Sequence, residues 1–285
     1  MEQSQPILRP TRIGDTDFRW GERTYVMGIC NLSPDSFSGN GLGGNIEKTI
    51  AQAQRMVAEG ADMIDVGGES TRPGTAPFSI DEIDSELQLV IPAIERLTSE
   101  ISVPVSIDTY KSGVASRALV AGASMINDIW ALKRDPKLVT LAADKGVPII
   151  LMSNQRDAPS EDIMPEIITD LKRAISLAKK IGIAEDNIIV DPGIGFGKTL
   201  EQNLEIVRRL AELKALGRPI LLGSSRKSMI GLVLDLPVDQ RVEGTAATVA
   251  IGIANGADIV RVHDVSQMVR VCRMSDAIIR TRLNS

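Results

Sequence analysis

The stretch from residue 103 to residue 128, VPVSIDTYKSGVASRALVAGASMIND, contains the unit from which the chain is built. A short apolar run ends abruptly at Asp108, a segment with helical apolar spacing follows and stops at Gly122, and a second apolar run ends at Asn127. Apolar runs of this length predict buried strands, and the segment between them predicts a helix. The unit therefore predicts two parallel strands joined by a crossover helix.

The same event, an apolar run ended by polar or charged residues, occurs eight times along the chain. The residues that end the runs are Asn31, Asp65 to Arg72, Asp108, Asn127 with Asp128, Asn154, Asp191, Ser224 to Lys227, and Arg261 with His263 and Asp264. Eight such units predict an α/β protein with a (β/α)8 TIM barrel, a fold that takes ~250 residues, and the active site of that fold lies at the carboxyl ends of the strands. The 285 residues fit one such barrel, so the sequence predicts where the site lies.

The N-terminal region predicts a different kind of structure. We expect residues 1–17 to be a loose leader and residues 18–285 to form a single catalytic domain. Phe18–Trp20 and Arg23–Tyr25, on either side of Gly21, predict an N-terminal hairpin that plugs the mouth of the barrel. An open doubly wound sheet is the competing fold, but it usually has a glycine-rich turn directly after the first strand.

Composition limits the partners and the compartment. The formal net charge is −5 and there is no long basic run, so we expect no nucleic-acid partner. No apolar run approaches the ~18 residues of a membrane helix, so we expect no membrane segment. Cys30 and Cys272 form neither a C-x-x-C pair nor a zinc pattern, which favours a reduced, cytoplasmic setting.

Polar residues at three strand ends predict a ligand site. Asp108, Asn127 and Asp191 end the third, fourth and sixth runs and should converge on one mouth of the barrel. Two carboxylates and an amide suit a flat heterocycle with several N–H donors. The alternative is that each residue caps the helix that follows it, although Pro192 and Gly193 separate Asp191 from its helix.

Two further segments predict an anion site. Ser224 to Ser228 follows the seventh run and includes Lys227, in the region where barrel enzymes often bind phosphate. The alternative is an ordinary helix capped by serine. Arg261 and His263, the single histidine of the chain, are two residues apart and share one face of the eighth strand. They suit a diphosphate, whereas a lone histidine is otherwise often structural.

Seven motifs in this order resemble those of the dihydropteroate synthases. They are MGICNLSPDSFS at 27–38, DVGGESTRPG at 65–74, SIDT at 106–109, IND at 126–128, DPGIGFGK at 191–198, SSRKS at 224–228 and RVHD at 261–264. The resemblance implies a barrel transferase of folate biosynthesis, a family that is the target of sulfonamides. It would join 6-hydroxymethyl-7,8-dihydropterin diphosphate to 4-aminobenzoate with Mg²⁺ and release diphosphate. It also implies a homodimer formed through the C-terminal helices.

The resemblance also implies a role for each matching residue. It assigns the pterin to Asp108, Asn127, Met152, Asp191, Phe196 and Lys227, the diphosphate to Asn31, Thr71, Arg72, Arg261 and His263, the aminobenzoate to Phe37, Pro73 and Ser228, and the metal to Asn31. Among these, it marks Asp108, Lys227, Arg261 and His263 as catalytic.

The chain departs from the family pattern at two places. The first loop reads DSFSGNGLGG at 35–44 and lacks the second aspartate that the family commonly has after Ser38, and Ser153 stands where the family often has histidine. Three other functions remain possible. They are a methyltetrahydrofolate methyltransferase that serves a cobalamin protein, a non-catalytic pterin-binding paralogue, and a phosphate-binding barrel of the aldolase kind.

Overall fold

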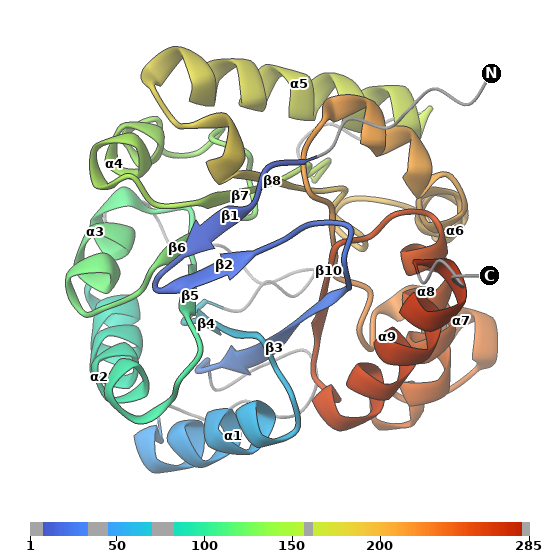
Figure 1. Cartoon of the computed structure of the whole chain (residues 1–285), viewed down its shortest axis with the longest axis horizontal. Coiled ribbons are helices and arrows are strands. Elements are labelled where there is room, and N and C mark those ends of the chain that lie inside the picture. The colour runs from blue at the N-terminus through green and yellow to red at the C-terminus, as the bar shows by residue number, and fades with distance from the viewer. Residues whose placement is uncertain (1–7, 34–44, 70–82, 157–161, 281–285) are drawn as a thin grey trace, which may run out of the picture.

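Parallel strands form a barrel inside a ring of helices (Figure 1), in a computed structural model that describes residues 8–33, 45–69, 83–156 and 162–280. The barrel strands are β3 (Tyr25–Asn31), β4 (Met63–Gly67), β5 (Val105–Asp108), β6 (Met125–Asp128), β7 (Ile149–Met152), β8 (Ile188–Asp191), β9 (Leu221–Leu222) and β10 (Ile259–Val262). Their order is β8-β7-β6-β5-β4-β3-β10-β9, and a parallel bridge between Val190 and Ile220 closes β8 onto β9. The predicted TIM barrel is confirmed, and the open sheet is excluded.

The helices lie outside the strands and cover them. They are α1 (Ile46–Ala58), α2 (Asp84–Glu100), α3 (Ser112–Val120), α4 (Lys137–Lys145), α5 (Ile163–Ile181), α6 (Leu200–Arg208), α7 (Ser228–Leu234), α8 (Val242–Ala254) and α9 (Val265–Ile279), with short 3-10 helices at Glu185–Asn187, Leu210–Leu216 and Val238–Gln240. No helix within the described ranges has both the length and the apolar character that crossing a membrane requires.

Strand alternation explains why the site is polar while the barrel floor is apolar. Alternate side chains of a strand point to opposite faces, so Val26 packs toward the helices and Met27 toward the interior. The interior floor consists of Met27, Met63, Met125, Ile150, Ile189, Leu221 and Ile259. Two residues farther along the same strands are Ile29, Asp65, Asn127, Met152, Asp191, Gly223 and Arg261. A single strand repeat therefore separates the apolar floor from a layer rich in polar groups.

The N-terminal hairpin lies earlier in the chain than expected. It consists of β1 (Thr11–Ile13) and β2 (Thr16–Phe18), paired antiparallel across a turn at Gly14. The expectation of a hairpin over Phe18–Tyr25 and of a loose leader over residues 1–17 is therefore wrong for the described part of that segment. The physical reason is burial, because Ile13 is fully buried, Phe18 is nearly so, and both join the apolar floor.

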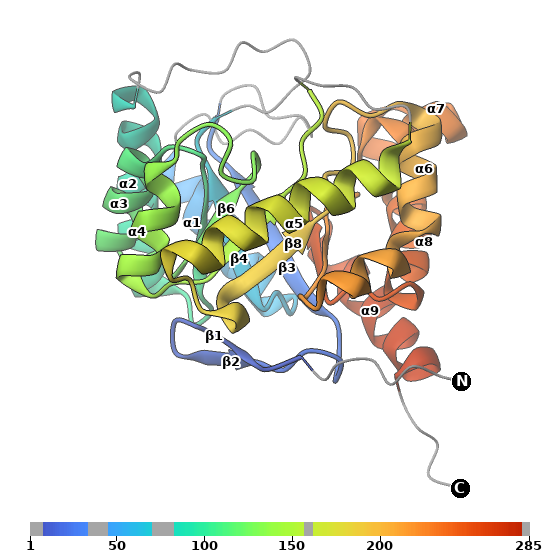
Figure 2. The ribbon, with the colours of Figure 1, turned by 90° about the horizontal axis from the view of Figure 1, so that it is seen from above.

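The hairpin covers the amino-terminal end of the barrel, as predicted. The Thr11 hydroxyl donates to the main-chain oxygen of Asp186, just before β8. The indole Nε1 of Trp20 donates to Thr11 Oγ1 at 2.9 Å and ties the hairpin to the segment that leads into β3. Figure 2 shows the hairpin below the barrel, on the side away from α7. The opposite, carboxyl-terminal mouth is the one that holds the polar layer.

Candidate active site

A pocket opens at the carboxyl-terminal mouth of the barrel, where the sequence predicts the site. Its lining includes all of the predicted site residues that the structure describes, namely Asn31, Asp108, Asn127, Met152, Asp191, Phe196, Lys227, Ser228, Arg261 and His263. The other four, Phe37, Thr71, Arg72 and Pro73, lie outside the described residues. Residues from most of the barrel strands therefore meet at one place, as the convergence argument requires.

Asp65 organises the polar layer, a role that its sequence motif does not indicate. Its side chain is fully buried, and Oδ2 accepts from Arg261 Nε at 2.6 Å and from Asn127 Nδ2 at 3.0 Å. Arg261 Nη2 also donates to Asp108 Oδ2 at 2.8 Å. These bonds join β4, β5, β6 and β10 across the mouth of the barrel. The signal was available, because Asp65 follows Met63 of the apolar floor by two residues.

Of the two carboxylates predicted to hold the heterocycle, Asp191 is buried and Asp108 is partly buried. Burial raises the pKa of Asp108 to about 7, with Asp65 adding to the increase and Arg261 opposing it. Burial also raises the pKa of Asp191, whose Oδ1 accepts from the main-chain nitrogen of Gly193 at 2.7 Å. Each carboxylate retains oxygen lone pairs that can accept N–H donors of a bound ring.

Helix capping does not explain these residues. The residues that precede the following helices are Lys111 before α3, Pro136 before α4 and Thr199 before α6. Thr199 itself forms a complete capping box with Gln202. None of Asp108, Asn127 and Asp191 therefore caps a helix, and the alternative is excluded.

An apolar wall and the partly buried Lys227 lie beside Asp191. Met152 and Phe196 are buried in a cluster with Tyr110, Ile129 and Trp130. Lys227 Nζ lies 4.1 Å from the centroid of the Phe196 ring and donates to the main-chain oxygen of Ile194 at 2.8 Å. Burial lowers the pKa of Lys227 to about 7, whereas Asp191 opposes that effect.

His263 is neutral, so Arg261 alone supplies positive charge from the end of β10. Ser225 Oγ accepts from the main-chain nitrogen of His263 at 3.2 Å and lies 3.0 Å from its Nδ1. A Ser225 hydroxyl that donates to Nδ1 leaves the ring hydrogen on Nε2. Burial lowers the pKa of His263 to about 3, and nearby Arg261 and Arg226 lower it further.

The serines after β9 do not cap α7. The residue that precedes α7 is Lys227, and its side chain makes no capping bond. Ser224 Oγ pairs with Thr248 Oγ1 at 2.8 Å, and Ser225 pairs with His263. The serine-cap alternative is therefore wrong. Ser225 is a further site residue, and its motif, SSRKS, does not by itself indicate that role.

Comparisons with known proteins agree with this geometry. A family model described as pterin binding enzyme matches residues 27–263. A dihydropteroate synthase of Clostridium beijerinckii is 50% identical over 270 residues, which cover 94% of this chain and 99% of that protein. The chain belongs to the dihydropteroate synthase family.

Solved structures of dihydropteroate synthases have the same fold. One from Clostridium difficile, determined in the presence of pteroic acid, is 48% identical, has a TM-score of 0.85 and covers 92% of this chain and 99% of its own. One from Xanthomonas albilineans with 4-aminobenzoic acid is 37% identical, has a TM-score of 0.88 and covers 96% of this chain and 99% of its own. The fold that the motifs imply is thus the fold of these relatives.

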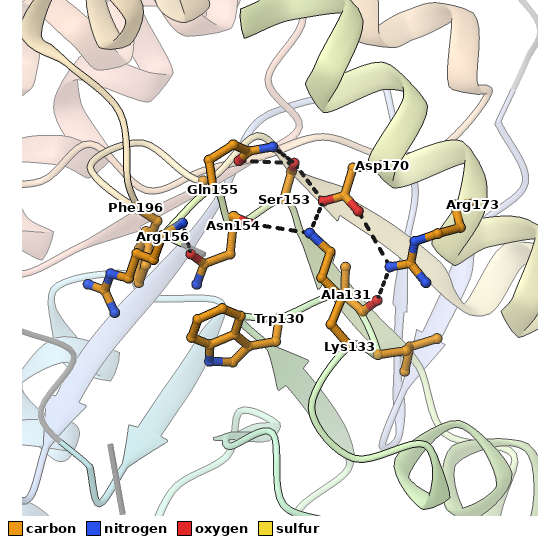
Figure 3. Close-up of polar contacts among 12 residues, drawn as sticks. Trp130, Ala131, Lys133, Ser153, Asn154, Gln155, Arg156, Asp170, Arg173 and Phe196 are labelled. Carbon is orange, nitrogen blue, oxygen red and sulfur yellow. Dashed lines mark hydrogen bonds and ion pairs between the residues drawn. The ribbon is translucent and has the colours of Figure 1, made fainter. Parts of the chain in front are cut away.

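Ser153, which stands where the dihydropteroate synthase family often has histidine, belongs to a polar network behind the pocket (Figure 3). Its Oγ donates to Asp170 Oδ2 at 2.9 Å and accepts from Gln155 Nε2 at 3.1 Å. Lys133 Nζ donates to the same Asp170 oxygen at 2.7 Å. Ser153 is fully buried and does not line the pocket, so it supports the loop after β7 from behind.

The described residues offer oxygen donors for the Mg²⁺ that the family resemblance implies. They include no group of three or more His, Cys, Asp or Glu that could form a metal cage. A Cβ added to Gly67 would lie 3.7 Å from both Asn31 Oδ1 and Asp108 Oδ2. These two oxygens therefore lie on either side of Gly67 at the carboxyl-terminal mouth of the barrel. Mg²⁺ in proteins commonly takes one or two protein oxygens, several waters and substrate phosphates. The donor set suits an ion that arrives with a diphosphate.

Proposed function

We propose that the pocket catalyses the reaction of its family, in which 4-aminobenzoate displaces diphosphate from 6-hydroxymethyl-7,8-dihydropterin diphosphate to form 7,8-dihydropteroate. The observation that carries this proposal is that Asp108, Asn127 and Asp191 line one pocket together with Arg261. Arg261 bonds Asp108 directly and is connected to Asn127 through Asp65. This polar layer offers acceptors to the donor-rich edge of a pterin, next to an apolar wall that fits its ring.

The pterin is assigned to the deep end of the pocket. Asp108 and Asp191 accept its N–H groups, and Asn127, whose Nδ2 is held by Asp65, presents its amide oxygen. Lys227 donates to a ring acceptor. Met152 and Phe196 cover the ring faces, in keeping with their place in the buried apolar cluster.

The diphosphate is assigned to the rim, on Asn31, Arg261 and His263, with Thr71 and Arg72 as further predicted contacts. Neutral His263 is assigned the tautomer in which Nδ1 accepts from the Ser225 hydroxyl and the Nε2 hydrogen donates to an oxygen of the leaving group. Asn31 would hold Mg²⁺, with Asp108 beside it. That ion, when bound, neutralises charge on the diphosphate.

The reaction proceeds by loss of the leaving group before attack. The bond between the pterin methylene carbon and the diphosphate oxygen breaks, and its electron pair leaves with the diphosphate. The Asp108 carboxylate stabilises the positive charge that develops on the pterin. The aniline nitrogen of 4-aminobenzoate then forms the new C–N bond and loses one proton to solvent, with no covalent bond to the enzyme.

The aminobenzoate is assigned to the outer part of the pocket. Ser228 is the first residue of α7 and lines the pocket, so its hydroxyl can donate to the substrate carboxylate. Phe37 and Pro73 remain the predicted contacts of the aromatic ring.

A homodimer through α7, α8 and α9 is part of the proposal. Leu232, Ile251, Met274 and Ile278 are 67%, 51%, 64% and 70% exposed on these three helices. Exposed apolar residues gathered on neighbouring elements are typical of a protein interface. We also assign the protein to the cytoplasm, since its free Cys30 and Cys272 fit a reducing compartment.

Diphosphate release tests the proposed function. Purified protein, Mg²⁺, the dihydropterin diphosphate and 4-aminobenzoate are combined, and each component is omitted in turn. We expect release to require both substrates and to match the dihydropteroate formed. A methyltetrahydrofolate methyltransferase would release no diphosphate, and a non-catalytic paralogue would bind the pterin without turnover. Either result contradicts the proposal.

A further inference from the structure

Lys198 lies behind the pterin pocket and does not line it. Its Nζ donates to the main-chain oxygens of Ser153 at 3.0 Å, Gly193 at 2.9 Å and Phe196 at 3.2 Å, and to Gln155 Oε1 at 2.9 Å. Two of these acceptors belong to the segment after β7 and two to the segment after β8. One ammonium group therefore joins the two loops, with four acceptors around three hydrogens.

The two loops approach so closely that no side chain fits between them. A Cβ on Gly193 would lie 2.0 Å from the main-chain oxygen of Ser153, and a Cβ on Gly197 would lie 2.4 Å from the carbonyl carbon of Gln155. The contact therefore brings carbonyl oxygens of both loops together. Without a cation between them these dipoles would repel one another. The oxygens of Gly193 and Phe196 would keep main-chain donors, but the Ser153 oxygen would lose the bond from Lys198, which is costly for a buried carbonyl.

The acceptors of Lys198 belong to the residues that shape the pterin site. Gly193 accepts from Lys198 through its oxygen, and its nitrogen donates to Asp191 Oδ1 at 2.7 Å. Phe196 also accepts from Lys198, and its ring lies in the pocket wall beside Lys227. The ammonium group thus holds the main chain at the two points from which the Asp191 carboxylate and the Phe196 ring are oriented.

We infer that Lys198 is a positioning residue of the pterin site, whose ammonium group locks the loops after β7 and β8 together and thereby fixes Asp191 and Phe196. This inference rests on the proposed function, which assigns those two residues to the pterin. Lys198 touches no substrate, so its loss should weaken pterin binding more than aminobenzoate binding.

The protonation of Lys198 provides an independent readout. Burial lowers its pKa to about 7; Asp191 and Asp170 oppose that decrease, and Lys227 and Lys133 add to it. A neutral amine has two hydrogens for four acceptors, so the contact that Lys198 makes between the two loops weakens as the pH rises through about 7. The KM for the dihydropterin diphosphate should increase over this range in the native enzyme, and the part of that increase due to Lys198 should be absent in a variant without the amine.

The test compares Lys198→Met with Lys133→Met. Lys133 Nζ also contacts the loop after β7, through the oxygen of Asn154 at 3.2 Å, but its other partner is Asp170 of α5 and not the loop after β8. In Lys198→Met we expect the KM for the dihydropterin diphosphate to rise by ~10- to 100-fold, a loss typical of misplaced binding groups. We expect the KM for 4-aminobenzoate to stay within about threefold, and Lys133→Met to keep both values.

Each result decides a different question. If the native enzyme has no turnover, the proposed function fails. If the native enzyme turns over and Lys198→Met keeps the native KM for the pterin substrate, or raises both KM values equally, the positioning role is wrong. If Lys198→Met does not fold, Lys198→Gln is measured in the same way. Its amide keeps two N–H groups, so we expect an intermediate KM for the pterin substrate, and a native value would contradict the inference.

Discussion

Arg261 Nε donates to Asp65 Oδ2 at 2.6 Å, beneath the surface of the pocket. Asp65 is fully buried, and the same oxygen also accepts from Asn127. A buried carboxylate shared by a guanidinium and an amide sets the direction of both donors. Asp65 is thus a positioning residue for two side chains that the family resemblance assigns to substrates.

The first prediction concerns Asp65→Asn. Removing one partner of a buried ion pair typically costs ~3–5 kcal/mol, because the other charge stays buried. Arg261 keeps Asp108 as a second partner, so we expect the lower end of that range in the free energy of unfolding measured with urea. Asp15→Asn is the control, since Asp15 pairs with Arg12 on the surface, where such pairs contribute little. Equal effects of the two substitutions would refute the role of Asp65.

The second prediction concerns pH and Asp108. Burial raises the pKa of this carboxyl to about 7, and the proposed role needs its ionised form. A group with a raised pKa takes up a proton as the pH falls through that value, so kcat/KM for the dihydropterin diphosphate should decrease below about pH 7. The side chain of Asp108→Asn cannot ionise. We expect this variant to have a low kcat/KM that does not decrease further as the pH falls below about 7.

The control for this prediction separates chemistry from binding. Diphosphate affinity of Asp108→Asn is measured by calorimetry beside its turnover. Because Asp108 stabilises charge on the pterin, turnover should decrease far more than diphosphate affinity. Equal losses of turnover and of diphosphate affinity would exclude the proposed role. So would a kcat/KM of the variant that still decreases below about pH 7.

The third prediction compares two glycines with left-handed backbones. Gly193 has φ +74° and its added Cβ would lie 2.0 Å from an oxygen of Ser153, whereas Gly217 has φ +61° and no atom within 4 Å of that position. Alanine at either site incurs roughly 1–2 kcal/mol of left-handed strain. Gly193→Ala should cost a further ~1–3 kcal/mol because the overlap forces the loops apart. Denaturant unfolding of the two variants measures the difference, and equal losses would contradict the close contact.

The sequence predicts the barrel and most of its polar layer because strand periodicity carries that information. Asp108, Asn127 and Asp191 each end an apolar run, so their place at the mouth follows from the fold. Asp65 is harder to predict as a site residue because it begins a polar segment that continues to Arg72 and that the sequence predicts as one loop. Its spacing of two residues from Met63 would have identified it.

Other features depend on contacts that strand periodicity does not contain. The charge state of His263 depends on its burial and on Arg261, Arg226 and Lys227, two of which come from the loop after β9. The role of Lys198 cannot be predicted from its place at the end of a glycine-rich turn, because its partners Ser153 and Gln155 come from a different loop. The strands of the N-terminal hairpin have three residues each, too few for alternation to mark them.

The last prediction concerns the exposed apolar surface of α7, α8 and α9. Ile278 is 70% exposed on α9, and Val120 is 77% exposed on α3, on the opposite side of the ring of helices (Figure 1). In a twofold dimer both subunits contribute the same surface patch to the interface. Ile278→Glu would therefore bury two carboxylates there, one from each subunit. Light scattering after gel filtration should give the native protein twice the 30.7 kDa chain mass and the variant a single chain mass.

Val120→Glu carries the same change of charge at a site outside the proposed interface and should stay dimeric. A monomeric native protein, or dissociation by both substitutions, would rule out this interface.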